Sequence, residues 1–318
     1  MLLKAVIALV VITCFGVIAC SNTMLPKKKT PAEKMQDFVI GISNYARSLK
    51  PGFVIIPQNG AELGYVNADT GKGFAKAYLD AIDAFAVEEL FYNGEYKPDT
   101  YRINLLEKLR AHKPVIAAEF IKNDSAIADA IDQCEKRNFL CYPRSAENYH
   151  YQLIPPIRNE NADNITSLSQ VRNYLYLINT SKFSSRENLL EELSKTNFDL
   201  ITIDLFHYAN KPYTPAELER LKTKANGGKR LVIAYVNIGA AEKWRYYWRP
   251  LWELGDPKWI AKPYEGYDGE FWVQYWSPEW QSIIFGNDTS YIKRIVDAGF
   301  DGAFLDNVEA YYFLYKDK

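Results

Sequence analysis

Short apolar runs alternate with amphipathic stretches along most of this chain. Eight of the runs have the length and the β-branched or aromatic content of buried strands. They span residues 53–59, 81–92 (with an apolar core at 83–87), 114–120, 139–143, 174–179, 199–206, 230–239 and 299–307. The stretches between most of them have helical spacing. Strands that alternate with helices predict an α/β fold, and specifically a (β/α)8 TIM barrel. A doubly wound open sheet is the alternative, which the lack of a G-x-G-x-x-G motif after any strand weakens.

The order of these elements is unusual for a barrel. The pattern opens with a helix at 33–50 that no strand precedes, and its last strand, 299–307, is followed by only a short segment. Residues 145–172 form a long polar join without a helical or alternating pattern, and such joins are uncommon inside compact domains. All three features follow from a circular permutation that fuses the usual barrel ends across 145–172. We therefore expect one circularly permuted barrel domain over residues 33–318.

The first twenty residues have a different pattern from the rest. An apolar run ends in Val-Ile-Ala-Cys at 17–20, which is typical of a bacterial lipoprotein signal peptide (1–20) whose Cys20 becomes lipidated. A transmembrane helix is the alternative, but the run is marginally short for spanning a bilayer. Residues 21–32 are polar and are typical of a flexible tether. We expect a lipid-anchored protein of the bacterial cell envelope, at the outer membrane in a Gram-negative cell because serine follows Cys20.

Composition excludes several classes of protein. The 318 residues carry a formal net charge of −1 and are 48% hydrophobic and 14% aromatic, without the basic excess of a nucleic-acid-binding protein. Three histidines, and neither an H-E-x-x-H nor a C-x-x-C motif, argue against a zinc site. We expect a monomer with no metal, cofactor or nucleic-acid partner. Cys134 and Cys141 either form a disulfide, as an exported protein allows, or remain two buried thiols.

Acidic residues bracket the last predicted strand. In GFDGAFLDNVEAY (299–311) the apolar strand lies between Asp301 and Asp306. A buried carboxylate is costly unless it is paired or used, and barrel enzymes hold their catalytic groups at the carboxyl ends of the strands. Asp306 is therefore a candidate functional group, with a structural acid paired to an arginine as the alternative. Asp301 lies at the amino end of the strand, where we expect a structural role.

Aromatic residues are concentrated in the connection between the last two predicted strands. All seven tryptophans fall between positions 244 and 280, with several tyrosines among them. Flat aromatic faces suit the C–H faces of sugar rings and can also hold a cation. The alternative is that most of these rings pack the connection onto the barrel. Such a cluster at a barrel mouth favours a carbohydrate ligand over a small charged metabolite.

Several segments resemble glycoside hydrolase family 114, the endo-α-1,4-polygalactosaminidase group. They are IAYVNIGAAEKWRYYW (233–248), GEFWVQYWSPEWQSIIF (269–285), GFDGAFLDNVEAY (299–311), YARSLKPGFVIIPQNGAEL (45–63) and AVEELFYN (86–93). In the family the last two follow the strand that ends in LDNV, whereas here they precede it. The resemblance therefore also implies a permuted barrel. It further implies an enzyme that cleaves an extracellular polysaccharide of α-1,4-linked galactosamine or N-acetylgalactosamine.

The resemblance also assigns roles to single residues. Asp306 and Glu88 match the family's carboxylates, and we expect Asp306 to be the nucleophile or stabiliser and Glu88 the acid/base. Because side chains alternate along a strand, we expect the neighbouring Glu89 to point away from the cleft. Asp204 is expected to hold the substrate or to be a solvated acid, and His207 to line the cleft or the surface. The other expected substrate contacts are Glu242, Gln58, Asn59, Trp244, Tyr247 and Trp276, with Arg245 orienting a carboxylate.

One departure from the family concerns Ala240. Relatives have an acid there, reading G-E-A-E where this chain reads G-A-A-E, although the second acid, Glu242, is present. The loss leaves two readings of function, a glycoside hydrolase and a non-catalytic carbohydrate-binding lipoprotein. A structural envelope protein without an open cleft is a third. The glycoside hydrolase reading requires that Glu88 and Asp306 converge in one cleft.

Overall fold

The computed structural model describes residues 28–207 and 210–314. Its helices are α1 (Pro31–Leu49), α2 (Lys76–Ala81), α3 (Thr100–Leu109), α4 (Ile127–Glu135), α5 (Arg186–Ser194), α6 (Pro215–Leu221), α7 (Pro278–Ile284), α8 (Tyr291–Ala298) and α9 (Ala310–Phe313). Its strands are β1 (Val54–Pro57), β2 (Phe85–Tyr96), β3 (Val115–Ile121), β4 (Leu140–Ser145), β5 (Tyr174–Leu177), β6 (Leu200–Asp204), β7 (Leu231–Asn237), β8 (Ala240–Glu242), β9 (Ile260–Pro263), β10 (Glu270–Val273) and β11 (Gly302–Asp306).

The predicted signal peptide, Cys20 and most of the predicted tether lie outside the described residues. The first helix begins at Pro31, two residues earlier than expected, because Thr30 and Glu33 form a capping box at its start. Of the helices described, none combines the length and the apolar character needed to cross a bilayer. Cys134 and Cys141 are free thiols, the first buried and the second partly so.

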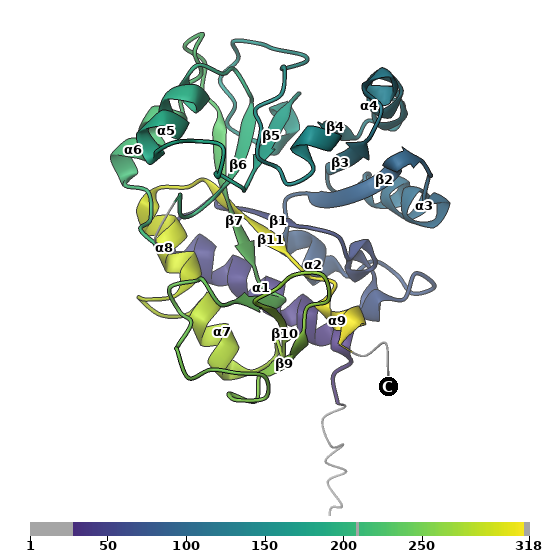
Figure 1. Cartoon of the computed structure of the whole chain (residues 1–318). Coiled ribbons are helices and arrows are strands. Elements are labelled where there is room, and N and C mark those ends of the chain that lie inside the picture. Colours follow the sequence, from purple (N-terminus) through teal and green to yellow (C-terminus); the bar gives the residue numbers. More distant parts are fainter. Residues whose placement is uncertain (1–27, 208–209, 315–318) are drawn as a thin grey trace, which may run out of the picture.

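Each of the eight predicted strand ranges overlaps an observed strand, and these eight strands are parallel to their neighbours. One sheet has the order β1-β11-β7-β6-β5 and a second has the order β2-β3-β4. A single parallel bridge between Gln58 and Ala86 joins the two sheets at β1 and β2. The last strand, β11, thus lies beside the first, as in a (β/α)8 barrel and unlike a doubly wound sheet (Figure 1).

The gap in this arrangement lies between β4 and β5, where the described residues form no hydrogen-bonded ladder. Side chains bridge it instead, since the rings of Tyr142 and Tyr174 are 5.4 Å apart. The findings therefore confirm an α/β fold with parallel sheets. β3, β6 and β7 are buried along their whole length, which explains why their sequences are apolar runs without alternation.

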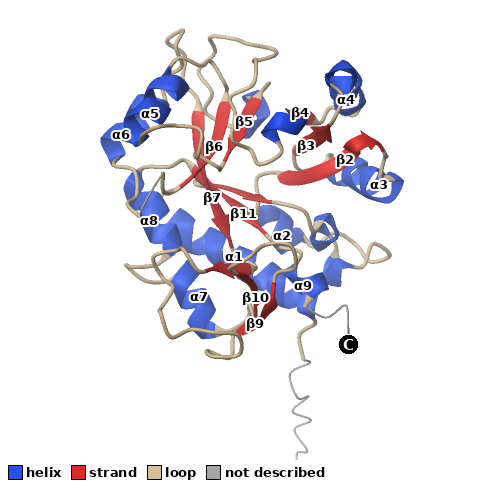
Figure 2. Ribbon diagram, in the orientation of Figure 1, coloured by secondary structure: helices blue, strands red, loops and turns tan. Residues whose placement is uncertain are grey.

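Helices cover the outside of the strands, with α5, α6 and α8 on one side and α3 and α4 on the other (Figure 2). A small antiparallel sheet, β8-β10-β9, follows β7 and carries the aromatic connection. Rings of four tryptophans form a chain there, with centroid distances of 5.6 Å, 4.9 Å and 5.1 Å for Trp248–Trp252, Trp252–Trp259 and Trp259–Trp280. For these four, the packing alternative is the one observed.

The long join between β4 and β5 contains no α-helix, as its lack of pattern predicts, but it is ordered by a buried ion pair. Lys224 donates to Asp199 at 2.6 Å, and both side chains are fully buried. Asp199 also accepts from the backbone N–H of Arg172 and from the side chain of Asn161, both in the join. A buried charge must be paired, so this pair fixes the join against β6.

Candidate active site

A cleft of about 770 Å³ opens at the carboxyl ends of β1 and β11 and beside the middle of β2. Both Glu88, from β2, and Asp306, from the end of β11, line it. The charge of Glu88 contributes to the raised pKa of Asp306, so the two carboxyl groups are near enough for their charges to interact. The structure thus brings together in one open cleft the two acids that lie 218 positions apart in the sequence.

Asp306 lies half-buried on the floor of this cleft. Its Oδ2 accepts a hydrogen bond of 2.5 Å from the hydroxyl of Tyr235, and its Oδ1 accepts one of 2.8 Å from the backbone N–H of Asn307. Burial, and then the charge of Glu88, raise the pKa of Asp306 to about 7, although these two hydrogen bonds oppose the rise. Asp306 can therefore hold or release a proton near neutral pH.

Glu88 and Glu89 both line the cleft, which corrects the expectation that Glu89 points away. The pairing of β2 with β3 is regular up to Glu88 and resumes only at Asn93, so the residues between form a bulge. Glu89 has a φ of +54°, which breaks the alternation of side chains. The Glu88 carboxylate accepts from the hydroxyl of Tyr151, and Glu89 forms an ion pair of 2.7 Å with Arg144.

Two charged side chains hold this bulge from its two sides. The buried Glu119 of β3 accepts the backbone N–H groups of residues 90, 91 and 92 at 3.3, 3.0 and 2.8 Å. Arg102 of α3 donates to the carbonyl oxygens of Glu88 and Glu89 at 2.9 and 2.8 Å. Burial raises the pKa of Glu119 to about 7 in spite of its three N–H donors. No sequence signal marks Glu119, because it lies within an apolar strand and its partners belong to an irregular segment.

Three further acids of the cleft, Glu62, Glu270 and Glu309, were not predicted. Glu309, three residues after Asp306, has a pKa raised to about 8 by burial and then by the charge of Asp306. Glu270, at the start of β10, has a pKa raised to about 8 by burial and then by the charges of Glu242 and Asp306. The strand-end position that singled out Asp306 could have suggested Glu309, one turn further on, whereas nothing in the sequence marks Glu270.

Gln58 and Asn59 line the cleft, as expected for residues at the end of β1. Gln58 is buried and accepts a hydrogen bond of 2.9 Å from the hydroxyl of Tyr176. Asn59 accepts from the backbone N–H of Glu88 at 3.3 Å and donates to Glu309 at 3.1 Å. Asn59 therefore connects two of the acidic residues of the cleft.

Asp204, Glu242 and Arg245 form a second cluster that does not line the cleft. Arg245 donates to Asp204 at 2.9 Å and to Glu242 at 2.5 Å, and all three residues are buried. Arg245 thus orients these two acids rather than Glu88 or Asp306. Ala240, where the family has an acid, is fully buried in β8 opposite Trp272. Asp204 and Glu242 are therefore too buried to contact a substrate, which corrects the expectation that they bind it.

The predicted aromatic contacts also lie outside the cleft, as does His207. Tyr247 is packed against Trp280 and accepts from the backbone N–H of Glu242. Trp276 lies under the ammonium group of Lys34, at 4.2 Å, and Trp244 is exposed. The connection folds onto its own small sheet, so its tyrosines at 264 and 267 reach the cleft and its tryptophans do not.

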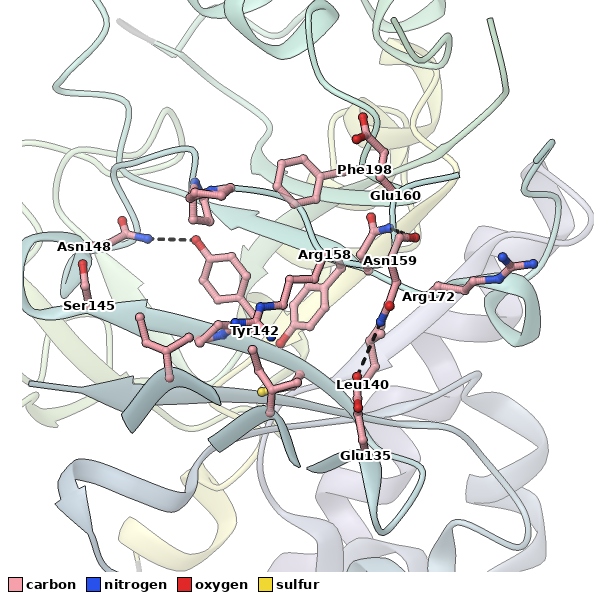
Figure 3. Close-up of a pocket in the computed structure, with 18 of the residues that line it drawn as sticks. Glu135, Leu140, Tyr142, Ser145, Asn148, Arg158, Asn159, Glu160, Arg172 and Phe198 are labelled. Carbon is pink, nitrogen blue, oxygen red and sulfur yellow. Dashed lines mark hydrogen bonds between the residues drawn. The ribbon is translucent and has the colours of Figure 1, made fainter. Parts of the chain in front are cut away.

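A second cavity, of about 850 Å³, lies along the outside of β4 and β5 where the join supplies no helix (Figure 3). Its lining is mainly apolar, and Asn148 donates to the hydroxyl of Tyr142 at 2.9 Å across it. It contains no pair of carboxylates on a strand end, so the cleft remains the candidate active site. Within residues 28–207 and 210–314, no three His, Cys, Asp or Glu side chains are grouped to hold a metal ion.

Parallel strands with an acidic cleft at the carboxyl ends of two of them define the class of protein, an α/β protein with parallel sheets. Residues 180–318 match the glycoside-hydrolase family GH114. The match includes β11 with Asp306 but not Glu88, which precedes it in the sequence.

The curated relatives are uncharacterized proteins. One from Methanocaldococcus jannaschii is 36% identical over 155 residues, which are 48% of this chain and 42% of the relative. One from Thermotoga maritima is 33% identical over 124 residues, 38% of this chain and 36% of the relative. One from Deinococcus radiodurans is 34% identical over 122 residues, 38% of this chain and 37% of the relative. The chain therefore spans less than half the length of each relative it matches.

Proposed function

We propose that this protein is a glycoside hydrolase that cleaves a polymer of α-1,4-linked galactosamine or N-acetylgalactosamine with two carboxyl groups. The observation that carries the proposal is the presence of Glu88 and Asp306 in one open cleft, interacting with each other. Hydrolysis of a glycosidic bond needs one group that protonates the leaving oxygen and one that acts as nucleophile or as base for water. The match of residues 180–318 to a glycoside hydrolase family supports this reaction class.

The environments of the two groups favour roles opposite to those expected from the sequence. Asp306 has its pKa raised to about 7, so it keeps a proton that it can give to the glycosidic oxygen as the bond to the anomeric carbon breaks. Glu88 is held by Tyr151 and by the bulge, and it bonds to the anomeric carbon or removes a proton from the attacking water. The anomeric configuration of the product distinguishes these two possibilities for Glu88.

The charge of the cleft supports an amino sugar as the substrate. Six carboxyl groups line it against two guanidinium groups. Both guanidinium groups are already paired, Arg102 with Asp99 and Arg144 with Glu89. The ammonium group of galactosamine would therefore enter a site with more carboxyl groups than guanidinium groups and with both arginines already paired.

The domain organisation and location belong to the same proposal. The first strand lies beside the last, and Glu88 shares a cleft with Asp306 although it lies outside the family match, which supports a closed, circularly permuted barrel. A lipid on Cys20 would anchor the enzyme, as a monomer, to the bacterial cell envelope, where an extracellular polysaccharide is accessible. These statements rest on the sequence pattern of residues 1–32 and 145–172.

The test is to incubate the full-length protein, purified in detergent, with partly deacetylated α-1,4-galactosaminan and to count new reducing ends. Glu88→Gln and Asp306→Asn are expected to abolish release, and Glu95→Gln, an exposed acid of β2 outside the cleft, is expected to keep it. Release that survives both cleft substitutions would refute the two-carboxylate mechanism. Binding without release in the unsubstituted protein would favour the non-catalytic carbohydrate-binding alternative, to which the missing acid at Ala240 points.

A further inference from the structure

We infer that Tyr149 and Tyr267 form two facing aromatic walls of a subsite that holds one galactosamine ring above the carboxyl groups of Glu88 and Asp306. This inference rests on the proposed function and specifies which residues bind the sugar ring. Neither tyrosine was among the expected substrate contacts. Tyr149 comes from the join after β4, and Tyr267 comes from the aromatic connection after β7, which we expected to favour a carbohydrate ligand.

Three of the tyrosines that line the cleft are exposed, namely Tyr149, Tyr267 and Tyr312, and the ring of Tyr312 packs against Phe313. Tyr149 is 43% exposed and Tyr267 is 54% exposed, and both line the cleft. Tyr151, Tyr176 and Tyr235, by contrast, are buried and use their hydroxyls on the side chains of Glu88, Gln58 and Asp306. The buried tyrosines therefore support the polar groups, whereas Tyr149 and Tyr267 have ring surface available to a ligand.

The ring of Tyr267 is supported by other aromatic rings. It lies in the tight loop between β9 and β10, where Gly266 and Gly269 take φ values of +87° and +83° that other residues rarely adopt. Its ring packs on Tyr264 at 4.7 Å, and Tyr264 in turn stacks on Trp272 at 4.1 Å. This column of rings fixes Tyr267 before any ligand arrives and leaves the rest of its surface open.

Tyr149 is supported in the same manner on the other wall. Its ring meets the ring of Phe120 edge-on at 4.8 Å, and the guanidinium of Arg144 lies 4.9 Å from its centroid. Arg144 also donates to the backbone carbonyl of Tyr149. The same arginine pairs with Glu89, so the bulge of β2 and the segment that carries Tyr149 are fixed together.

Tyr267 lines the same cleft as Tyr149 and the two acids. Burial raises the pKa of Tyr267, and the charges of Glu88, Tyr149 and Asp306 raise it further. A pyranose ring between the two tyrosines would stack its apolar C–H faces on them. Its ammonium and hydroxyl groups would then face the carboxyl groups below.

The inference is tested with Tyr149→Ala and Tyr267→Ala, each beside the conservative change to phenylalanine, in the full-length protein. Each alanine variant is expected to raise KM for partly deacetylated α-1,4-galactosaminan by roughly 3- to 10-fold with little change in kcat, because a ring contact is worth about 0.5–1.5 kcal/mol. The phenylalanine variants are expected to behave like the unsubstituted protein. Tyr96→Ala is the matched control, since Tyr96 is 54% exposed and also packs on another tyrosine but lies outside the cleft.

Binding of a galactosamine oligosaccharide, measured by calorimetry on the Glu88→Gln protein and on its double variants with Tyr149→Ala and Tyr267→Ala, separates this inference from the proposed function. Hydrolysis with KM unchanged in both alanine variants would overturn the subsite and leave the hydrolase intact. Binding that the alanine changes weaken, without hydrolysis in the unsubstituted protein, would support the subsite and overturn the hydrolase. Neither binding nor hydrolysis would overturn both.

Discussion

Two acidic clusters lie near the carboxyl ends of the parallel strands, and their carboxyl groups have different kinds of partner. In the first, Asp204 and Glu242 share the guanidinium of Arg245, and all three side chains are buried. In the second, Glu88 and Asp306 lie in an open cleft with tyrosine hydroxyls as their side-chain partners. An arginine holds carboxylates in the charged form, whereas a tyrosine hydroxyl can accompany a carboxyl group that keeps its proton.

The comparison shows how the same residue types can serve structure or chemistry. Burial raises the pKa of the Glu242 carboxyl, and the charge of Arg245 beside it opposes that rise. A carboxyl group with a pKa of about 7, such as Asp306, can transfer a proton. An acid at a strand end is therefore informative about catalysis only when its partners are known.

The largest expected effect is on the chemistry of the open cluster. Asp306→Asn removes the proton donor, and we expect kcat on galactosaminan to fall by about 10²- to 10⁴-fold while KM changes little. The free energy of unfolding should not fall, because Asn is not penalised by burial as a charged carboxylate is. Steady-state kinetics and urea denaturation of the same preparation measure both. A loss of stability with unchanged kcat would make Asp306 a structural acid like Asp204.

Arg245→Met should have the opposite signature. It leaves Asp204 and Glu242 buried without a cation, and we expect the free energy of unfolding to fall by about 3–5 kcal/mol. Arg249→Met is the control, because Arg249 is an exposed arginine four residues further on. Replacing Asp204 and Glu242 by leucine together with Arg245→Met should recover much of the loss, since a buried ion cluster can be exchanged for apolar contacts. An unchanged denaturation midpoint for Arg245→Met would mean that this cluster is not what stabilises the strand ends.

Periodicity could predict the strands and Asp306, whereas the other members of the two clusters were expected from the resemblance to the family. Buried parallel strands leave apolar runs, so β1 to β7 and β11 were all located, and Asp306 was found because it ends such a run. Glu119 could not be found, because an acid inside an apolar strand gives no hint of the N–H groups that surround it. The direction of Glu89 was wrong for the same reason, since a bulge is set by tertiary contacts such as Arg102 and Glu119.

Glu119→Gln is expected to affect chemistry through position alone. The glutamine amide keeps one oxygen acceptor but places its NH2 donor group against the N–H groups of the bulge, which are also donors. Glu88 should therefore shift, and kcat should fall by up to about 10²-fold at unchanged KM. Arg102→Lys weakens the hydrogen bonds to the carbonyl oxygens of the same bulge. It should also lower kcat, because lysine cannot form the two parallel hydrogen bonds that arginine donates. Both are measured at a temperature where circular dichroism shows the folded state. Unchanged kcat in both folded variants would mean that the bulge does not position Glu88.

The smallest expected effect is a shift in pH dependence. If Asp306 is the proton donor, kcat/KM is maximal below the Asp306 pKa of about 7. It falls as pH rises through that value, because Asp306 loses its proton. The hydroxyl of Tyr235 lowers the pKa of Asp306, so Tyr235→Phe should raise that pKa and move the falling limb to higher pH. Tyr213→Phe is the control, because Tyr213 is equally buried but lies outside the cleft. A limb that moves to lower pH, or the same shift in the control, would show that the group titrating near pH 7 is not Asp306. Glu309 and Glu270, with pKa values of about 8, would then be the groups to replace next, because only a carboxyl group that keeps its proton at neutral pH can protonate the leaving oxygen there.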